Sequence, residues 1–150
     1  MATCTISSVD ARDVDALVAL FEAQLQEHSI ETSQEDLRTV IEAVIADVRY
    51  GFILAAAAPD GTVVGAAYAS SLLSFEHGGI SGWLEELYVL PQWRDQGIGT
   101  DLLAAVIARA KEVGWRALDL EVDATHQRAI PLYTRHEFHP RSRTRFYRML

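Results

Sequence analysis

Apolar residues in the first third of the chain recur at every third or fourth position, which is the spacing of helices that bury one face. The first stripe consists of Val14, Leu17, Val18, Phe21 and Leu25. The second consists of Leu37, Val40, Ile41, Val44, Ile45 and Val48. Asp10 and Ser33 precede these stripes, and their side chains can cap a helix N-terminus. The pattern predicts two amphipathic helices, after a weakly alternating edge strand over residues 3–7.

The middle of the chain has shorter apolar runs that are typical of β-strands. The predicted strands cover residues 52–57, 63–73 and 80–90. Two sequences that favour turns separate them, Pro59-Asp60-Gly61 and His77-Gly78-Gly79. We therefore expect consecutive antiparallel strands in this part of the chain.

The last third of the chain returns to helical periodicity. Residues 102–110 are rich in alanine and leucine and predict a buried helix that ends at Gly114. The predicted elements that follow are a half-buried strand over residues 117–122, a short helix over 128–136, and closing strands at Phe138 and over 143–150.

The order of these elements is βαα-βββ-αβ-α-ββ. The strand, helix and strand of residues 84–122 form a natural parallel crossover, whereas the preceding strands are joined by hairpins. The order therefore predicts an α/β architecture with a mixed sheet flanked by helices. A length of 150 residues and a hydrophobic content of 49% suit one globular domain over residues 1–150.

The connection that enters the third long helix has the chemistry of an anion site. It contains Arg94, Gly97 and Gly99. A glycine-containing turn at a helix N-terminus presents backbone N–H groups at the positive end of the helix dipole, so its natural ligand is a phosphate or pyrophosphate. A P-loop is excluded because the lysine is absent, and a dinucleotide fingerprint is excluded because Leu102 stands where a third glycine is required.

The remaining pattern, Arg-x-x-Gly-x-Gly, resembles the acyl-CoA pyrophosphate loop of the GNAT superfamily of N-acetyltransferases. The resemblance implies the GNAT fold and acetyl-CoA as co-substrate. In that family the loop binds the pyrophosphate, and the backbone of the preceding strand binds pantetheine. The acetyl-CoA-binding residues implied here are Leu87, Tyr88, Val89, Arg94, Asp95, Gln96, Gly97, Ile98, Gly99 and Thr100. Asp95 is expected to point to solvent and complement the helix dipole.

A second motif over residues 122–138 is similar to the family's Asn-x-x-Ala-x-x-Leu-Tyr-x-x-x-Gly-Phe segment. The positions that match in register are Ala129, Leu132, Tyr133 and Phe138. The resemblance makes Tyr133 the general acid that protonates the departing thiolate, because a phenol keeps its proton at neutral pH.

Two residues depart from this second motif. His126 replaces the asparagine that contacts the pantetheine arm and caps the helix, and an imidazole can donate or accept one such hydrogen bond. His126 is therefore kept among the implied cofactor-binding residues. Glu137 replaces a glycine, and we expect a different exit from the helix there, without loss of chemistry.

Acetyl transfer to an amine also needs a general base, because an amine is mostly ammonium at neutral pH. Glu85 and Glu86 lie in a Leu-Glu-Glu segment that is similar to the Leu-Glu-Asp segment of diamine acetyltransferases within the family. This resemblance makes Glu85 the first candidate for the base and Glu86 the second. Alternation along a strand predicts that the two side chains point to opposite faces, so that one of them reaches the amine directly.

The net charge of −8 is unevenly distributed, with −11 over residues 1–93 and +3 over residues 94–150. An acidic front half suits a cationic acceptor meeting an anionic cofactor, and it argues against nucleic acid as a partner. The single cysteine, Cys4, fits the reducing cytoplasm. The apolar runs are too short to span a membrane, and the histidines do not have metal-ligand spacing.

Taken together, the residues and the resemblance predict a cytoplasmic N-acetyltransferase that moves an acetyl group from acetyl-CoA to a primary amine of a small cationic molecule. We expect no metal, no nucleic acid and no membrane partner, and a homodimer stays open. Two alternatives also stay open: acetylation of peptide or protein N-termini, and a CoA-binding regulatory module without turnover.

Overall fold

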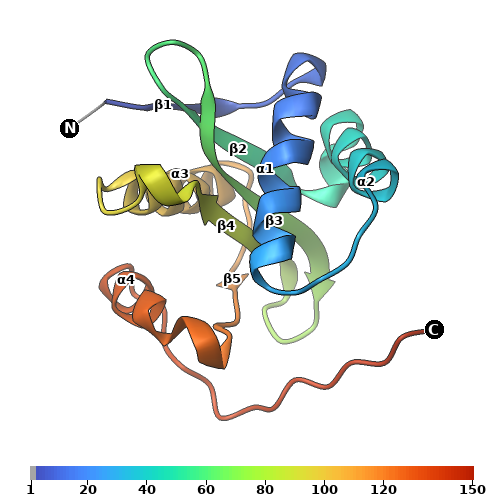
Figure 1. The fold of residues 1–150 in the computed structure, drawn as a ribbon. Helices are drawn as coiled ribbons and strands as arrows, with labels where there is room; N and C mark the ends of the chain where they lie inside the picture. Colours follow the sequence, from blue (N-terminus) through green and yellow to red (C-terminus); the bar gives the residue numbers. More distant parts are fainter. Residues whose placement is uncertain (1–2) are drawn as a thin grey trace.

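A five-stranded mixed sheet forms the centre of the computed structural model, which describes residues 3–150 (Figure 1). Its strands lie in chain order: β1 (Thr5–Ser8), β2 (Phe52–Ala57), β3 (Val63–Ser74), β4 (Gly79–Val89) and β5 (Leu118–Asp119). The first four strands pair antiparallel, and β5 runs parallel to β4. The predicted mixed sheet and its parallel crossover are therefore confirmed.

Helices cover both faces of this sheet (Figure 1). The two N-terminal helices, α1 (Val14–Glu27) and α2 (Gln34–Ala46), pack on one face, and α3 (Ile98–Glu112) packs on the other. The short α4 (Ile130–Arg135) follows β5. Within residues 3–150, no helix is both long and apolar enough to cross a bilayer.

The predicted helix starts are confirmed by their caps. The Asp10 side chain accepts a hydrogen bond from the Arg12 backbone N–H at 2.8 Å, which starts a short 3-10 turn that leads into α1. Ser33 Oγ accepts from the Asp36 backbone N–H at 3.0 Å at the start of α2. Each side chain satisfies a backbone donor that would otherwise lack an intrahelical partner.

The strand β2 shows why the central apolar runs are continuous. Ile53 and Ala55 pack among α1 and α2, whereas Leu54 and Ala56 pack on the α3 face. All four side chains are buried because both faces of the sheet are covered. A central strand that is buried on both faces needs no polar alternation.

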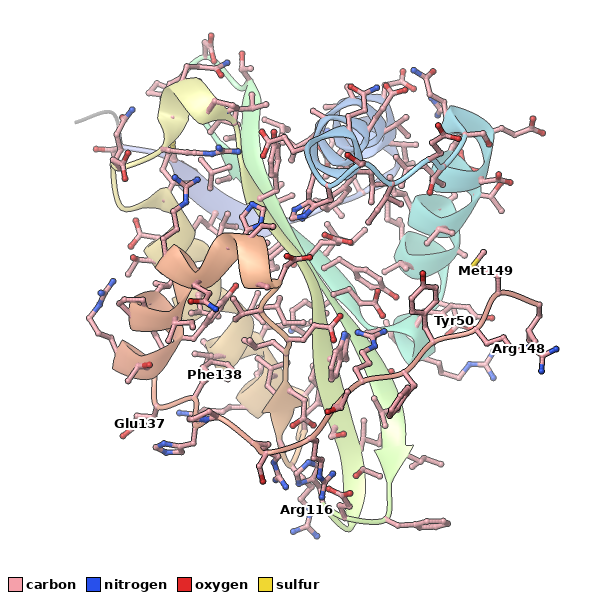
Figure 2. All side chains as sticks on the ribbon, turned by 60° about the horizontal axis from the view of Figure 1, so that its bottom comes forward. Tyr50, Arg116, Glu137, Phe138, Arg148 and Met149 are labelled. Carbon is pink, nitrogen blue, oxygen red and sulfur yellow. The ribbon has the colours of Figure 1, made fainter. Side chains whose placement is uncertain are left out.

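The C-terminal end differs from the sequence prediction. The strand predicted over 117–122 is confined to Leu118–Asp119, and the closing strands predicted at Phe138 and over 143–150 are absent from the described residues. The chain after Phe138 instead runs on in extended form to Arg148 and Met149 (Figure 2).

Side chains alone hold this C-terminal segment, residues 139–150, against the domain. Arg143 forms an ion pair with Glu76 at 2.8 Å, and Arg145 forms one with Glu121. The apolar side chains beyond these ion pairs are almost fully exposed, namely Phe146, Tyr147, Met149 and Leu150. The alternating pattern favours extended backbone, but a strand also requires a neighbouring edge for its N–H and C=O groups, and none faces this segment among residues 3–150.

Candidate active site

The strand β4 has a bulge at Glu85. In the pairing with β3, Glu86 lies opposite Tyr68 and Leu84 lies opposite Ala69, so Glu85 has no partner in the ladder. A bulge inserts one residue and interrupts the alternation of side chains. Glu85 and Glu86 consequently line the same cavity, and the prediction that they point to opposite faces is wrong.

This carboxylate cavity lies between β4 and the two N-terminal helices and has a volume of about 130 Å³. Its remaining walls are mostly apolar: α1 supplies Phe21 and Leu25, and α2 and β2 supply further aliphatic side chains. Phe21 and Leu25 belong to the predicted apolar stripe of α1. The cavity therefore combines two negative side chains with an apolar surround, which strengthens electrostatic interactions inside it.

The electrostatics of the two carboxyls differ. Burial and, after it, the charge of the neighbouring Glu85 raise the pKa of Glu86 to about 7, against an opposing effect of the Gln24 side chain. Glu85 is exposed, and its charge adds to burial in raising the pKa of the Tyr68 phenol. A carboxyl that titrates near neutral pH can both take up and release a proton there, as a general base must.

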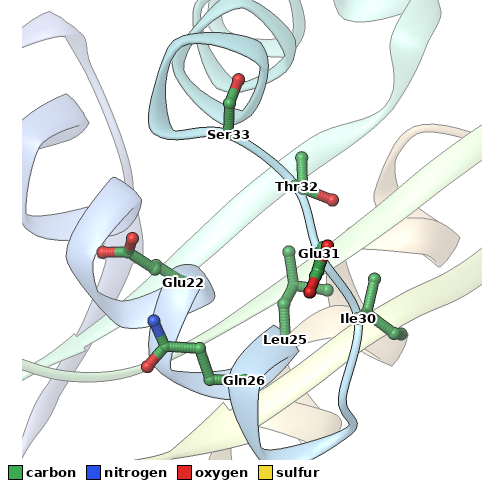
Figure 3. Close-up of a pocket in the computed structure, with 7 residues that line it drawn as sticks. All are labelled: Glu22, Leu25, Gln26, Ile30, Glu31, Thr32 and Ser33. Carbon is green, nitrogen blue, oxygen red and sulfur yellow. The ribbon is translucent and has the colours of Figure 1, made fainter.

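A larger, more open pocket of about 360 Å³ adjoins the carboxylate cavity, and Leu25 lines both. It lies between α1 and the loop that leads to α2 (Figure 3). Glu22 from α1 and Glu31 from the loop supply its negative charge. The Gln34 side-chain amide donates to Glu22 at 2.9 Å and so ties the start of α2 to this rim.

The loop between β4 and α3 forms an open cradle at the helix N-terminus. Two of its residues are left-handed, Asp95 with φ 60° and Gly97 with φ 84°. Gly97 is the N-cap of α3, and no side chain caps the first turn. A Cβ added to Gly97 or Gly99 would meet no heavy atom within 4 Å. The backbone N–H groups of this turn are therefore accessible, as an anion site requires.

The other predicted residues of the cradle contribute in different ways. Asp95 is exposed, as expected. Ile98 is buried in the core beneath α3, so it can offer only its backbone N–H. Gln96 donates to the Gln92 carbonyl at 3.4 Å, and Thr100 lies half-buried in the first turn of α3.

Arg94 does not extend freely into this cradle. One of its terminal nitrogens donates to both Glu27 carboxylate oxygens, at 2.9 and 3.0 Å, and Nε donates to the Val89 carbonyl at 2.9 Å. The Tyr88 hydroxyl donates to the same carboxylate at 2.8 Å. Burial and the hydrogen bond to Glu27 together raise the pKa of Tyr88 to about 12, although Arg94 opposes the rise. Arg94 thus ties the loop to β4 and to the end of α1.

The edge of β4 is open where pantetheine binding is predicted. β5 pairs with β4 only through Gly82 and Trp83, whereas β4 continues to Val89. Within residues 3–150, the backbone of Leu87, Tyr88 and Val89 therefore has no strand neighbour on this side, although the Val89 carbonyl is used by Arg94. Such an edge can pair with an extended ligand.

His126 packs against the C-terminal end of α1. Its ring lies against that of His28 at the end of α1, with the ring centroids 4.5 Å apart. Asp123, rather than His126, caps the following turn, since its side chain accepts from the Thr125 backbone N–H at 2.8 Å. His126 therefore stays a predicted cofactor-binding residue, and the capping function belongs to Asp123.

Tyr133 lies on α4, on the α3 side of the sheet, and not in the carboxylate cavity. Its ring meets Phe138 edge to face, with the centroids 5.9 Å apart. Burial raises the pKa of the phenol, which therefore holds its proton through the neutral range. The structure thus groups Glu85 and Glu86 on one face and places Tyr133 on the other, with the open edge of β4 between the two faces.

The exit from α4 corrects a further prediction. Glu137 has a φ of 64°, in the left-handed region, and the Phe138 N–H donates to the Tyr133 carbonyl at 3.1 Å. This is the helix ending that a glycine ordinarily makes. The helix therefore ends in the way that a glycine at position 137 would allow. Glutamate adopts the left-handed backbone conformation there, although this conformation is unfavourable for a residue with a Cβ.

Sequence reasoning missed Gln24, which is only 5% exposed and whose amide oxygen has no hydrogen-bond partner within residues 3–150. A signal was available, because position 24 lies one heptad after Leu17 and three residues after Phe21, on the buried stripe of α1. A polar residue on that stripe indicates a specific partner in the interior.

Comparison with known proteins identifies relatives of this arrangement. Residues 16–138 match the acetyltransferase (GNAT) family profile. The chain is 37% identical over 87 residues to an aminoglycoside N(6')-acetyltransferase type 1 of Stenotrophomonas maltophilia. That match covers 51% of this chain and 57% of the relative, so the chain spans little more than half the length of that protein.

Solved structures share the fold over nearly the whole chain. An integron cassette protein from the mobile metagenome of Cole Harbour Salt Marsh matches with a TM-score of 0.85 and 24% identity, covering 97% of this chain and 90% of that one. The aminoglycoside N-acetyltransferase AAC(6')-Iy, in complex with CoA, matches with a TM-score of 0.84 and 20% identity, covering 99% and 96%. At these identities the likeness concerns the fold.

Proposed function

The chain belongs to the acetyltransferase (GNAT) family, and we propose that it transfers an acetyl group from acetyl-CoA to a primary amine of a small cationic acceptor. The observation that carries the proposal is the pair Glu85 and Glu86 in one cavity, on the strand that leads into the anion cradle of α3.

The residues at the start of α3 fit the pyrophosphate of acetyl-CoA. The cradle is open at Gly97 and Gly99, and its N–H groups lie at the positive end of a 15-residue helix. The free edge of β4 at Leu87 and Tyr88 offers backbone groups to the pantetheine amides, and the His126 imidazole is the further proposed contact. When bound, acetyl-CoA supplies the activated acetyl group.

Glu86 is the proposed general base. Its carboxylate takes a proton from the acceptor's ammonium nitrogen, and its half-buried position with a pKa near 7 suits that task better than the exposed position of Glu85. Glu85 holds the cationic acceptor in the cavity by charge. Tyr133 keeps a proton on its hydroxyl oxygen and delivers it to the leaving sulfur from the other side of the open edge.

The proposed acceptor class is a polyamine or aminoglycoside-like amine. The relative from Stenotrophomonas maltophilia is an aminoglycoside N-acetyltransferase, and the carboxylate cavity adjoins a second pocket that carries Glu22 and Glu31. A molecule with several ammonium groups could contact both negative regions, whereas a singly charged peptide N-terminus would leave one of them unpaired.

The direct test is release of CoA from acetyl-CoA with a panel of aminoglycosides, polyamines and peptides. We expect turnover with the multiply charged amines and weak or no turnover with the peptides. If the protein preferred peptide N-termini, the proposed class of acceptor would be wrong. If it bound acetyl-CoA but acetylated nothing on the panel, a regulatory module would be favoured.

A homodimer belongs to the same proposal. The feature that supports it is the C-terminal segment, whose exposed Phe146, Tyr147 and Met149 have no sheet partner within residues 3–150. A second copy can supply such an edge. Light scattering should give twice the chain mass for the protein and the single mass after removal of residues 141–150, and a single mass for both would exclude the dimer.

A further inference from the structure

Glu27 has an unfavourable position for a negative side chain. It is the last residue of α1, where the helix dipole already places partial negative charge, and the last turn of the helix contains no basic residue to offset it. Its side chain is 34% exposed, so water compensates its charge only in part. A carboxylate at this end of a helix therefore requires partners from other parts of the fold.

These partners come from β4 and from the loop that follows it. One terminal nitrogen of Arg94 donates to both Glu27 carboxylate oxygens, at 2.9 and 3.0 Å, and the Tyr88 hydroxyl donates to one of them at 2.8 Å. The Arg94 guanidinium also lies over the Tyr88 ring, 5.3 Å from its centroid. Burial raises the pKa of the Glu27 carboxyl, but the hydrogen bonds from Tyr88 and Arg94 outweigh burial and bring the pKa below its usual value. Glu27 is therefore an ionised partner of Arg94 at neutral pH.

The contact fixes the residue that precedes the left-handed part of the anion cradle. Arg94 Nε donates to the Val89 carbonyl at 2.9 Å, so the guanidinium is bound to β4 on one side and to Glu27 on the other. The next residue, Asp95, has a φ of 60°, a conformation that is unfavourable for a residue with a Cβ. Such a conformation persists only where the surrounding contacts hold it. The anchored Arg94 side chain is the contact directly before it.

Two effects of Glu27 on an anion bound at this loop have opposite signs. Its negative charge repels the anion, but the ion pair with Arg94 and the partial exposure of both side chains weaken that repulsion. Its hold on Arg94 orders the loop before the anion arrives, which raises affinity because less freedom is lost on binding. The open part of the cradle is formed by backbone at Gly97 and Gly99, so the order of the loop decides how well it binds.

We propose that Glu27 is a positioning residue for acetyl-CoA: by holding Arg94, it keeps the loop between β4 and α3 in the conformation that binds the pyrophosphate. The proposal rests on the proposed binding of acetyl-CoA at this loop. It makes α1 an element of both halves of the site, since Phe21 and Leu25 of the same helix line the carboxylate cavity.

The experiment compares the dissociation constant of acetyl-CoA, measured by calorimetry, in the wild type, Glu27→Gln and Glu112→Gln. Glu112 is the matched control, because it is also the last residue of a helix, accepts from Arg109 at 2.7 Å, and lies at the opposite end of α3 from the cradle. Glu27→Gln should raise the dissociation constant about tenfold, because the charge-assisted hydrogen bonds to Arg94 are lost. Glu112→Gln should leave it unchanged. An unchanged or lower dissociation constant in Glu27→Gln overturns the proposal, since loss of a repelling charge alone would tighten binding.

A double-mutant cycle with Arg94→Met tests whether Glu27 acts through Arg94. Arg94→Met should weaken acetyl-CoA binding, and Glu27→Gln should add little to that loss, because the contact between the two residues is already gone. An equal effect of Glu27→Gln in both backgrounds overturns positioning through Arg94. If Glu27→Gln does not fold, Glu27→Asp replaces it: the charge stays but the side chain is too short to hold Arg94 with both oxygens, so binding should again weaken, and unchanged binding again overturns the proposal.

Failure of this proposal differs from failure of the proposed function. If the wild type acetylates amines and Glu27→Gln binds acetyl-CoA equally well, the function stands and positioning by Glu27 is rejected, even if the variant melts at a lower temperature. If Glu27→Gln weakens binding but the wild type acetylates no amine on the panel, positioning is supported and the proposed function is not. If the wild type does not bind acetyl-CoA, both are rejected.

Discussion

Glu85 and Glu86 line one cavity although neighbouring residues of a strand ordinarily point to opposite faces. The bulge at Glu85 brings this about, since it leaves Glu85 without a partner opposite β3. Two carboxylates in one partly buried cavity repel each other, so one of them holds its proton to higher pH than an isolated carboxyl would. Glu86, the more buried of the two, is that residue.

The stability of the protein should depend on pH through Glu86. Its pKa is about 7 in the folded state and near the ordinary 4.5 in the unfolded chain, so its contribution is fully favourable below pH 4.5 and is lost as the pH rises through 7. Ionised Glu86 then costs up to about 3 kcal/mol. Glu86→Gln should therefore be more stable than the wild type at pH 8, by a clearly smaller margin at pH 5, and nearly equal to it at pH 3, as measured by urea unfolding.

The control for this measurement is Glu85→Gln. Glu85 is exposed, and its removal should give a smaller gain at pH 8, through the repulsion that it exerts on Glu86. An equal change for Glu86→Gln at pH 5 and pH 8 would show that the effect is packing and not ionisation.

The same two variants should separate in their kinetics. Glu86→Gln should lower kcat/KM at neutral pH by about 10²- to 10⁴-fold, the range of a positioned base, and the loss should shrink at high pH, where the amine is already neutral. Glu85→Gln should mainly raise KM for a multiply charged acceptor. The rate of CoA release between pH 6 and pH 9.5 gives kcat/KM and KM for each variant. If Glu85→Gln lowers kcat/KM and Glu86→Gln mainly raises KM, the base is Glu85.

Tyr133→Phe should lower turnover by about 10²-fold, because the ring remains but the proton of the hydroxyl is lost. Affinity for acetyl-CoA, measured by calorimetry, should change little. Tyr147→Phe in the exposed C-terminal segment is the matched control and should keep wild-type turnover. If Tyr133→Phe keeps full activity, the proton donor is water and not Tyr133.

Acetyl-CoA should stabilise the protein by about 2.7 kcal/mol when present at 100 times its dissociation constant. Gly99→Leu should abolish this stabilisation, since its side chain would project into the open cradle of α3 without backbone strain. Ala104→Leu, at an exposed position of the same helix, should keep it. The measurement is the melting temperature of each variant with and without acetyl-CoA. If Gly99→Leu keeps the increase in melting temperature, the pyrophosphate does not bind at this loop.

Glu137→Gly should stabilise the protein by about 1 kcal/mol, because the left-handed backbone at this position costs a side-chain-bearing residue energy that glycine does not incur. Glu137→Ala keeps the Cβ and should give no such gain. Urea unfolding of the two variants distinguishes relief of backbone strain from loss of the charge, which both variants share.

The local pattern of the sequence predicted the elements whose partners are nearby. The stripe of α1 and the run of β2 appear as expected because helix periodicity and a fully apolar strand are each sufficient to specify burial. The prediction of the closing strands was wrong because a strand also needs the edge of a neighbouring strand, which can come from a distant part of the chain. The alternating arginines after residue 140 specify only an extended chain.

The sequence indicated which residues belong to the candidate site, but not how they are arranged in space. Gly97 and Gly99 indicated the cradle because a helix N-terminus is a local feature. The bulge at Glu85 was not visible, because it arises from the change of register between β3 and β4 and has no local signal in the sequence of β4.

The ladder between β3 and β4 would be uniform if β4 were one residue shorter. Glu86 opposite Tyr68 and Leu84 opposite Ala69 would then be consecutive pairs, and every apolar residue of β4 would keep its present face. The architecture thus does not need Glu85, and deleting it would leave a regular strand with one carboxylate. In this sheet the second negative charge therefore occupies an inserted position, outside the regular ladder that positions the core.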